Sequence, residues 1–255
     1  MLTNITICGE DRDNTIITWD DHANIKMPAG GLDSEAAVKG KPMGTFRTYT
    51  LKVQGSYITL KNITIENNAA KLGQAVSLHL EGDHILVQNC RLLGNQDTVY
   101  TGIANNRSAF YDCYIEGTTD FIFGPGRAWF ENCEIRSKAN SYITAASSPA
   151  GQEYGYVFNK CKLTAEPGID KVYLGRPWRP YAATLFMNCE MGSHIRPEGW
   201  HNWGKHSNEQ TARYSEYNNH GSGAATKARV AWSRQLTKKE AAKVTIKNVF
   251  GEEAW

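Results

Sequence analysis

One short unit recurs five times between residues 85 and 193: ILVQNCRLLG (85–94), AFYDCYIEG (109–117), WFENCEIRS (129–137), YVFNKCKLTA (156–165) and LFMNCEMGS (185–193). The cysteines of these units follow one another at steps of 23, 20, 28 and 28 residues. An earlier copy, KNITIENNA (61–69), lacks the cysteine. Each unit has the length of a strand, alternates in polarity and is rich in β-branched or aromatic residues. A repeat of this period predicts a solenoid.

The spacing of the units favours one kind of solenoid. Strands of about five residues recur every 20 to 28 residues, with no long helical pattern between them. This arrangement is typical of an all-β fold, the right-handed, single-stranded parallel β-helix, in which each coil stacks on the previous one. Residues at equivalent positions of successive units are then expected to stack as well.

The six cysteines each lie late in a short apolar run, and none forms a CxxC pair. We expect them to form a buried column, because free cysteine packs as a small hydrophobic residue. A disulfide between stacked neighbours is the main alternative, and metal binding has the least support. The column is expected to contain Cys8, Cys90, Cys113, Cys133, Cys161 and Cys189.

Residues 1–255 are interpreted as a single catalytic domain, since a chain of this length can bury a sizeable core. The tail, residues 227–255, mixes a helix-like stretch with apolar pieces and is expected to pack along the solenoid as a C-terminal cap. The chain begins inside a strand-like segment, NITICG (4–9). We therefore expect the first coil to be incomplete, with residues missing before Met1.

Composition excludes some classes of protein. The net charge is only +2, which gives no reason to expect a nucleic-acid partner. No run of eighteen apolar residues is present, so no membrane span is predicted, and the first residues lack the pattern of a signal peptide.

Two aspartates follow the repeat. Asp97 and Asp120 each lie seven residues after a cysteine and are 23 residues apart, the step from Cys90 to Cys113. The repeat thus predicts two carboxylates about 5 Å apart at the backbone, one strand spacing. Neighbouring carboxylates do not ionise independently, so a proton donor and an anionic nucleophile can coexist.

Three further polar residues belong to the same candidate site. Gln74 lies 22 residues before Gln96, again about one coil, and two amides beside two carboxylates could form an oxyanion site. Arg176 could keep one carboxylate ionised through a bidentate pair. The alternative is structural, because polar ladders and turn residues are common in solenoids.

Aromatic residues crowd the same segments. About half are expected in the core, and the others could stack on sugar rings in a groove. The set comprises Phe46, Tyr100, Phe121, Phe123, Trp178, Trp200 and Trp203.

Four motifs in this order resemble the pectin methylesterases, or pectinesterases: GQAVSL (73–78), GNQDTVY (94–100), GTTDFIFG (117–124) and YLGRPW (173–178). Weaker similarity covers nearly the whole chain. The resemblance implies the pectin lyase-like β-helix with an open cleft for homogalacturonan, and hydrolysis of its methyl esters without a metal or other cofactor.

The resemblance also implies roles for single residues. Asp120 attacks the C6 carbonyl and forms a covalent intermediate, and Asp97 protonates the departing methanol and then activates water. Gln74 and Gln96 stabilise the oxyanion, and Arg176 orients Asp120. Substrate contacts are expected from Trp178, Thr45, Tyr100, Phe123 and Trp203.

The resemblance finally implies pectin as the partner of a monomeric, secreted protein, extracellular or periplasmic. The sequence of the segment PEGWHNW (197–203) favours a bacterial source. Two alternatives stay open: a pectate lyase or polygalacturonase on the same fold, and an inactive glycan-binding homologue.

Overall fold

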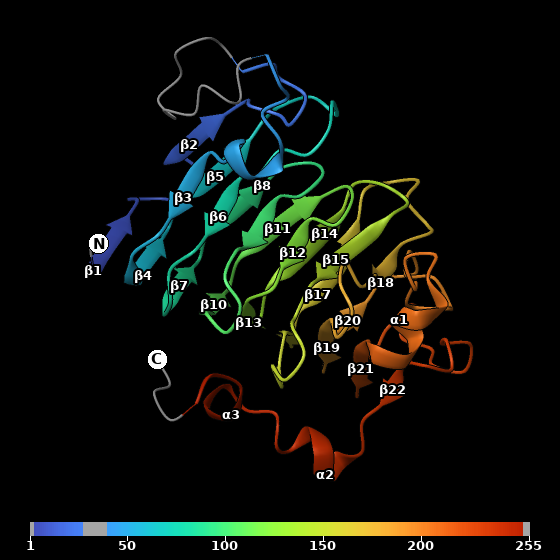
Figure 1. Ribbon diagram of the computed structural model, residues 1–255. Coiled ribbons are helices and arrows are strands. Elements are labelled where there is room, and N and C mark those ends of the chain that lie inside the picture. The colour runs from blue at the N-terminus through green and yellow to red at the C-terminus, as the bar shows by residue number, and fades with distance from the viewer. Residues whose placement is uncertain (1–2, 28–39, 252–255) are drawn as a thin grey trace.

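The computed structural model describes residues 3–27 and 40–251. Their strands form three sheets in which the paired strands are parallel, and each coil from β1 to β18 contributes one strand to each sheet (Figure 1). The chain runs from sheet 1 to sheet 2 to sheet 3 and then returns to sheet 1 one coil further on. This arrangement confirms the predicted all-β parallel β-helix.

The elements have the following bounds. Sheet 1 contains β1 (Thr3–Cys8), β4 (Ser56–Lys61), β7 (Ile85–Gln88), β10 (Arg107–Tyr111), β13 (Arg127–Glu131), β16 (Tyr156–Asn159), β19 (Ala183–Met187), β21 (Arg213–Tyr217) and β22 (Arg234–Gln235). Sheet 2 contains β2 (Ile16–Trp19), β5 (Thr64–Asn67), β8 (Arg91–Leu93), β11 (Tyr114–Gly117), β14 (Glu134–Ser137), β17 (Lys162–Ala165) and β20 (Glu190–Met191). Sheet 3 contains β3 (Leu51–Val53), β6 (Leu78–Leu80), β9 (Val99–Thr101), β12 (Ile122–Gly124), β15 (Tyr142–Ala146) and β18 (Tyr173–Gly175). The helices are η2 (Thr45–Arg47), α1 (His206–Thr211), α2 (Lys238–Ala241) and α3 (Ile246–Phe250).

The corner between sheets 1 and 2 explains the Asn or Asp that stands before four of the six cysteines. Asn89, Asp112, Asn132 and Asn188 all have φ between 50° and 56°. Asn and Asp adopt this left-handed conformation more readily than most residues, so a single residue turns the chain. Their side chains also bond between coils, as from Asn132 Nδ2 to Asp112 Oδ1 at 2.6 Å.

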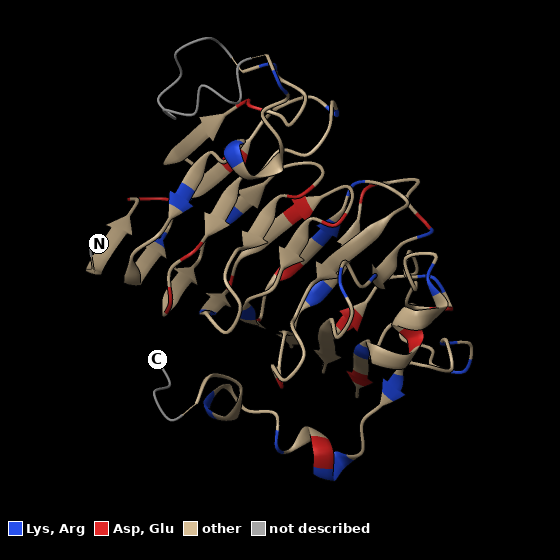
Figure 2. Cartoon of the chain, in the orientation of Figure 1, with Lys and Arg blue, Asp and Glu red and all other residues tan. Residues whose placement is uncertain are grey.

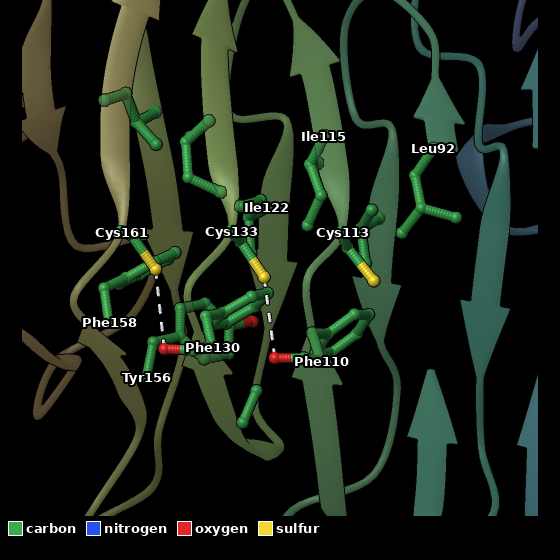
Figure 3. Packing of buried hydrophobic residues seen from close by; sticks show 14 of the residues in the cluster. Leu92, Phe110, Cys113, Ile115, Ile122, Phe130, Cys133, Tyr156, Phe158 and Cys161 are labelled. Atoms are coloured by element: carbon green, nitrogen blue, oxygen red, sulfur yellow. Dashed lines mark hydrogen bonds between the residues drawn. The ribbon is translucent and has the colours of Figure 1, made fainter. Parts of the chain in front are cut away.

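The cysteines after these corners form the predicted column, with one exception. Figure 3 shows Cys113, Cys133 and Cys161 stacked beside Phe110, Phe130 and Phe158. Each thiol contacts a carbonyl of the preceding coil, as Cys133 Sγ does with Phe110 O at 3.5 Å. All six cysteines are free thiols, so the disulfide alternative is not realised.

Cys8 is the exception, and its placement in the column was wrong. It is exposed and pairs with Lys61 in the next coil. The register of β4 with β7, Lys61 with Gln88, places Ile63 at the level of Cys90. Ile63 is buried and takes the place of the cysteine in that coil, so Cys8 lies two positions short of the column.

The C-terminal tail packs along the outer face of sheet 1 (Figure 1). Val249 and Phe250 of α3 are buried in an apolar cluster with Trp129, among others. Arg127 Nη1 donates to Val249 O at 2.9 Å and Arg107 Nη1 donates to Phe250 O at 3.0 Å. These bonds satisfy carbonyls that the end of a helix leaves unpaired.

Charged residues of both signs are distributed over all the coils rather than gathered at one end (Figure 2). Within the described part of the chain, no helix is long and apolar enough to cross a membrane.

Candidate active site

The two predicted aspartates lie on neighbouring coils at the same level. Asp97 and Asp120 stand two residues before β9 and β12, and these strands pair Val99 with Ile122. Both aspartates have a positive φ, 68° and 50°, at the corner that leads into sheet 3. They are 8% and 5% exposed, so both carboxyl groups are largely shielded from water.

Arg176 holds Asp120 from the side opposite Asp97. Its Nε donates to Oδ1 at 3.0 Å and its Nη2 donates to Oδ2 at 2.7 Å, which is the bidentate geometry that favours an ionised carboxylate. The guanidinium lies between two aromatic rings, with Cζ 3.9 Å from the centre of Tyr142 and 3.8 Å from that of Trp203. The rings keep the guanidinium plane in place.

The surroundings of the two aspartates affect their pKa values differently. Burial raises the pKa of Asp97 well above its usual range, and the charge of Asp120 raises it further, against the opposing charge of Arg176. Burial also raises the pKa of Asp120, but there the hydrogen bonds and the charge of Arg176 act against it. Asp97 therefore keeps its proton to higher pH than Asp120, so the pair can supply an acid and an anion together.

A cleft of about 190 Å³ opens above the pair. Both glutamines line it, although they are not in strict register: β6 and β9 pair Leu78 with Val99, which places Ala75 rather than Gln74 at the level of Gln96. Gln74 follows Gly73, whose φ of 140° suits glycine and whose Cβ would lie 2.9 Å from Asn24 Nδ2. The amides of the two glutamines are thus presented to the cleft by different local backbone.

Aromatic residues form much of the rest of the cleft. Nine of the ten predicted site residues line it, namely Asp97, Asp120, Gln74, Gln96, Arg176, Trp178, Thr45, Phe123 and Trp203. The tenth, Tyr100, lies beside Phe123 on the neighbouring strand, with ring centres 4.7 Å apart. Phe121 and Trp200 belong to the core, being 0% and 1% exposed, as expected for part of the aromatic set.

Some residues of the site were not predicted. Ala145 lines the cleft, and Tyr142 supports Arg176. Phe46, which was named in the aromatic set but not among the expected substrate contacts, also lines the cleft. Tyr142 could have been found by continuing the 22- to 23-residue step beyond Asp120.

A larger cavity, about 410 Å³, lies between sheet 1 and the tail. Arg234 at its rim pairs with Glu240 at 2.6 Å, and the pair is largely exposed. No two carboxyl groups on the described residues around this cavity are coupled as Asp97 and Asp120 are, so the smaller cleft is the candidate active site.

Known proteins are similar to this chain over nearly its whole length. The pectinesterase family model matches residues 1–253. The chain belongs to the pectinesterase family. Pectinesterase 31 of Arabidopsis thaliana is 38% identical over 239 residues, covering 93% of this chain and 73% of the relative. Probable pectinesterase A of the fungus Neosartorya fischeri is also 38% identical, over 82% of this chain and 60% of the relative.

Solved pectinesterases have the same fold. The carrot pectin methylesterase superposes with a TM-score of 0.87 at 29% identity, covering 99% of this chain and 79% of that one. The enzyme from Yersinia enterocolitica gives 0.85 at 29% identity, covering 99% and 89%. These neighbours confirm the right-handed parallel β-helix and support the pectinesterase assignment over the lyase and polygalacturonase alternatives.

The relatives qualify two expectations. The curated relatives named above come from a plant and a fungus, so the expectation of a bacterial source is not supported. The chain spans 58% of pectinesterase QRT1 and 65% of putative pectinesterase 11, both of Arabidopsis thaliana, so it corresponds to part of the length of several pectinesterases.

Proposed function

We propose that this chain hydrolyses the methyl esters of galacturonate units in pectin, giving methanol and a free carboxylate. The observation that carries the proposal is the bidentate bond of Arg176 to Asp120 beside a buried Asp97 that lacks such a bond. A pectin methylesterase in complex with a hexasaccharide superposes on the chain with a TM-score of 0.80 at 27% identity. That complex supports pectin oligosaccharides as the class of substrate.

The first half of the reaction forms a covalent intermediate. The Asp120 carboxylate attacks the C6 carbonyl carbon, and the resulting oxyanion accepts N–H bonds from the amides of Gln74 and Gln96. As the tetrahedral intermediate collapses, the bond from carbon to the methoxy oxygen breaks and Asp97 gives its proton to that oxygen. Methanol leaves, and the uronate remains as an acyl group on Asp120.

The second half returns the enzyme to its starting state. Asp97, now a carboxylate, takes a proton from water as the water oxygen attacks the acyl carbon. The bond to Asp120 breaks and leaves Asp120 as a carboxylate, Asp97 is again protonated, and the uronic acid formed loses its own proton to solvent. Arg176 stabilises Asp120 as a leaving carboxylate, and the aromatic walls of Phe123 and Trp178 hold the sugar.

We further propose that residues 1–255 act as one monomeric domain capped by the tail, in the extracellular or periplasmic space. The burial of Val249 and Phe250 against sheet 1 supports a cap role for the tail. The location follows from the substrate, because pectin is a polymer outside the cell.

The test measures methanol released from methyl-esterified pectin by the wild type and by Asp120→Asn. We expect release by the wild type with a bell-shaped pH profile, rising as Asp120 ionises and falling as Asp97 loses its proton. Asp120→Asn should lower kcat by several powers of ten while the protein stays folded.

Two further measurements separate the alternatives. A lyase would produce an unsaturated, ultraviolet-absorbing product and lose activity with a chelator, whereas the esterase should do neither. Binding of pectin without methanol release above background would support the inactive homologue instead.

A further inference from the structure

On the next two coils, tyrosines occupy the positions that are level with the catalytic pair. Pairing of Ile122 with Thr144 places Tyr142 opposite Asp120, and Asp120 N donates to Tyr142 O at 2.8 Å. Tyr142 in turn pairs with Tyr173. The two rings are stacked, with centres 5.3 Å apart and planes at 13°. We call the positions Val76, Asp97, Asp120, Tyr142 and Tyr173 the catalytic row.

Each tyrosine of the row carries an arginine on its face. Arg176 lies over Tyr142, and Arg196 lies over Tyr173 with Cζ 4.8 Å from the ring centre. The ring of His201 packs against both tyrosines, 5.4 and 5.3 Å away. Its pKa is lowered by burial and by the charges of Arg176 and Arg196, so the imidazole adds no charge near neutral pH.

The two arginines differ in how fully they are engaged. Arg176 donates from Nε and Nη2 to the two carboxylate oxygens of Asp120. Arg196 makes one contact with a carboxylate, from Nε to Glu198 Oε2 at 3.3 Å, and these side chains are 31% and 46% exposed. Among the described residues, the Nη atoms of Arg196 have no hydrogen-bond partner; only its Nε is bonded, to Glu198. Its fork can therefore accept a second carboxylate.

On the opposite side of the cleft, two cationic or titratable side chains of the described part of the chain share one carboxylate. There Lys52 lies 3.0 Å from Glu81 and His79 lies 2.9 Å from the same carboxylate. The position of the row next to Asp97 is Val76, which is buried and apolar. Lys52 and His79 are thus engaged by Glu81, whereas Arg196 on the other side makes only one contact with a carboxylate.

We propose that Arg196, on the face of Tyr173, is a specificity-determining residue that binds the free carboxylate of a neighbouring, already de-esterified uronate. Tyr173 lies two strand spacings, roughly 10 Å, from Asp120, too far to contact the unit being hydrolysed. A guanidinium fork matches a carboxylate, and a methyl ester cannot form that ion pair. Glu198 competes with the substrate for the arginine.

This inference rests on the proposed function, and its test is a ratio of rates. Methanol release is measured on a fully methyl-esterified hexagalacturonate and on hexamers with one free carboxylate at each position in turn. The wild type should favour one free position by roughly fivefold in kcat/KM, as one partly exposed charge pair allows. That preference should weaken as salt is raised.

Variants identify the residue responsible. Arg196→Ala should reduce the ratio to about one, and Glu198→Gln should increase it because the competing carboxylate is gone. Arg91→Ala is the matched control, since Arg91 also lies over a tyrosine, Tyr114, and pairs with a carboxylate, Asp13, but on sheet 2. It should leave the ratio and the basal rate as in the wild type.

The outcomes separate the two proposals. No methanol from any hexamer with wild-type protein would reject the esterase activity itself. Hydrolysis of the fully esterified hexamer with no preferred position, or a preference that survives in Arg196→Ala, would overturn the role of Arg196 and leave the esterase intact.

Discussion

The cysteine column and the catalytic row are built by the same stacking of coils, yet they use it in opposite ways. In the column, four successive coils after Cys90 repeat one residue and one contact, a thiol against a carbonyl of the coil before it. In the row, successive coils place Val76, Asp97, Asp120 and Tyr142 at one level. Packing is served by identical neighbours, whereas acid and anion chemistry needs unlike neighbours one strand apart.

The strongest test of this contrast changes Asp97, the row residue with the largest assigned chemical role besides Asp120. Asp97→Asn should lower kcat by several powers of ten, because an amide can neither donate the proton to methanol nor take one from water. The free energy of unfolding, in contrast, should increase at neutral pH. A buried carboxyl with a raised pKa is fully tolerated only below the usual Asp pKa of about 3.9, and its contribution is lost as pH rises through the raised pKa.

Asp97→Asn should therefore be more stable than the wild type at neutral pH, and the difference should disappear below about pH 4. Denaturant unfolding at several pH values measures this, beside a methanol assay. Activity within tenfold of the wild type, or lower stability at neutral pH, would contradict the assigned state of Asp97.

A smaller effect is expected from the amide next to it. Gln96→Ala should reduce kcat by about 10²-fold with little change in KM, as loss of one oxyanion donor does. Gln54→Ala is the control. The Gln54 amide donates to Glu81 Oε2 at 2.9 Å and does not line the cleft. A change confined to KM would make Gln96 a binding residue only.

The smallest effect is expected in the column. Cys133→Ala removes one buried sulfur and should cost about 1 kcal/mol of stability, with the rate of methanol release unchanged. Cys8→Ala, at the exposed cysteine, should change neither quantity. Denaturation midpoints and initial rates for both variants decide this. A large loss of activity in Cys133→Ala would remove the distinction between column and row.

The sequence predicts which coils place the two aspartates side by side, but not every residue that lines the cleft. Asp97 and Asp120 could be placed because the 23-residue step of the cysteines holds in all three sheets of that coil. The step from β6 to β9 is shorter than the separation of Gln74 and Gln96, since the loops before sheet 3 differ in length. Periodicity fixes strands, and loops add their own offsets.

Some of the residues that were missed, or placed wrongly, lie where the repeat stops applying. His201 follows β18 in a segment without a regular strand. Cys8 was assigned to the column because ITIC resembles the later units, although its strand pairs two positions out of step. A motif in one strand does not reveal its neighbour's register.

The attachment of α3 to β10 and β13 bears on how the chain reaches its folded state. Arg107 and Arg127 donate to carbonyls of residues that lie 143 and 122 positions further along the chain. Such long-range closure is slow relative to the stacking of adjacent coils, because the intervening chain must already be ordered. A nascent chain would therefore stack its coils one by one as they emerge, while the outer face of sheet 1 stays open until synthesis has passed Phe250.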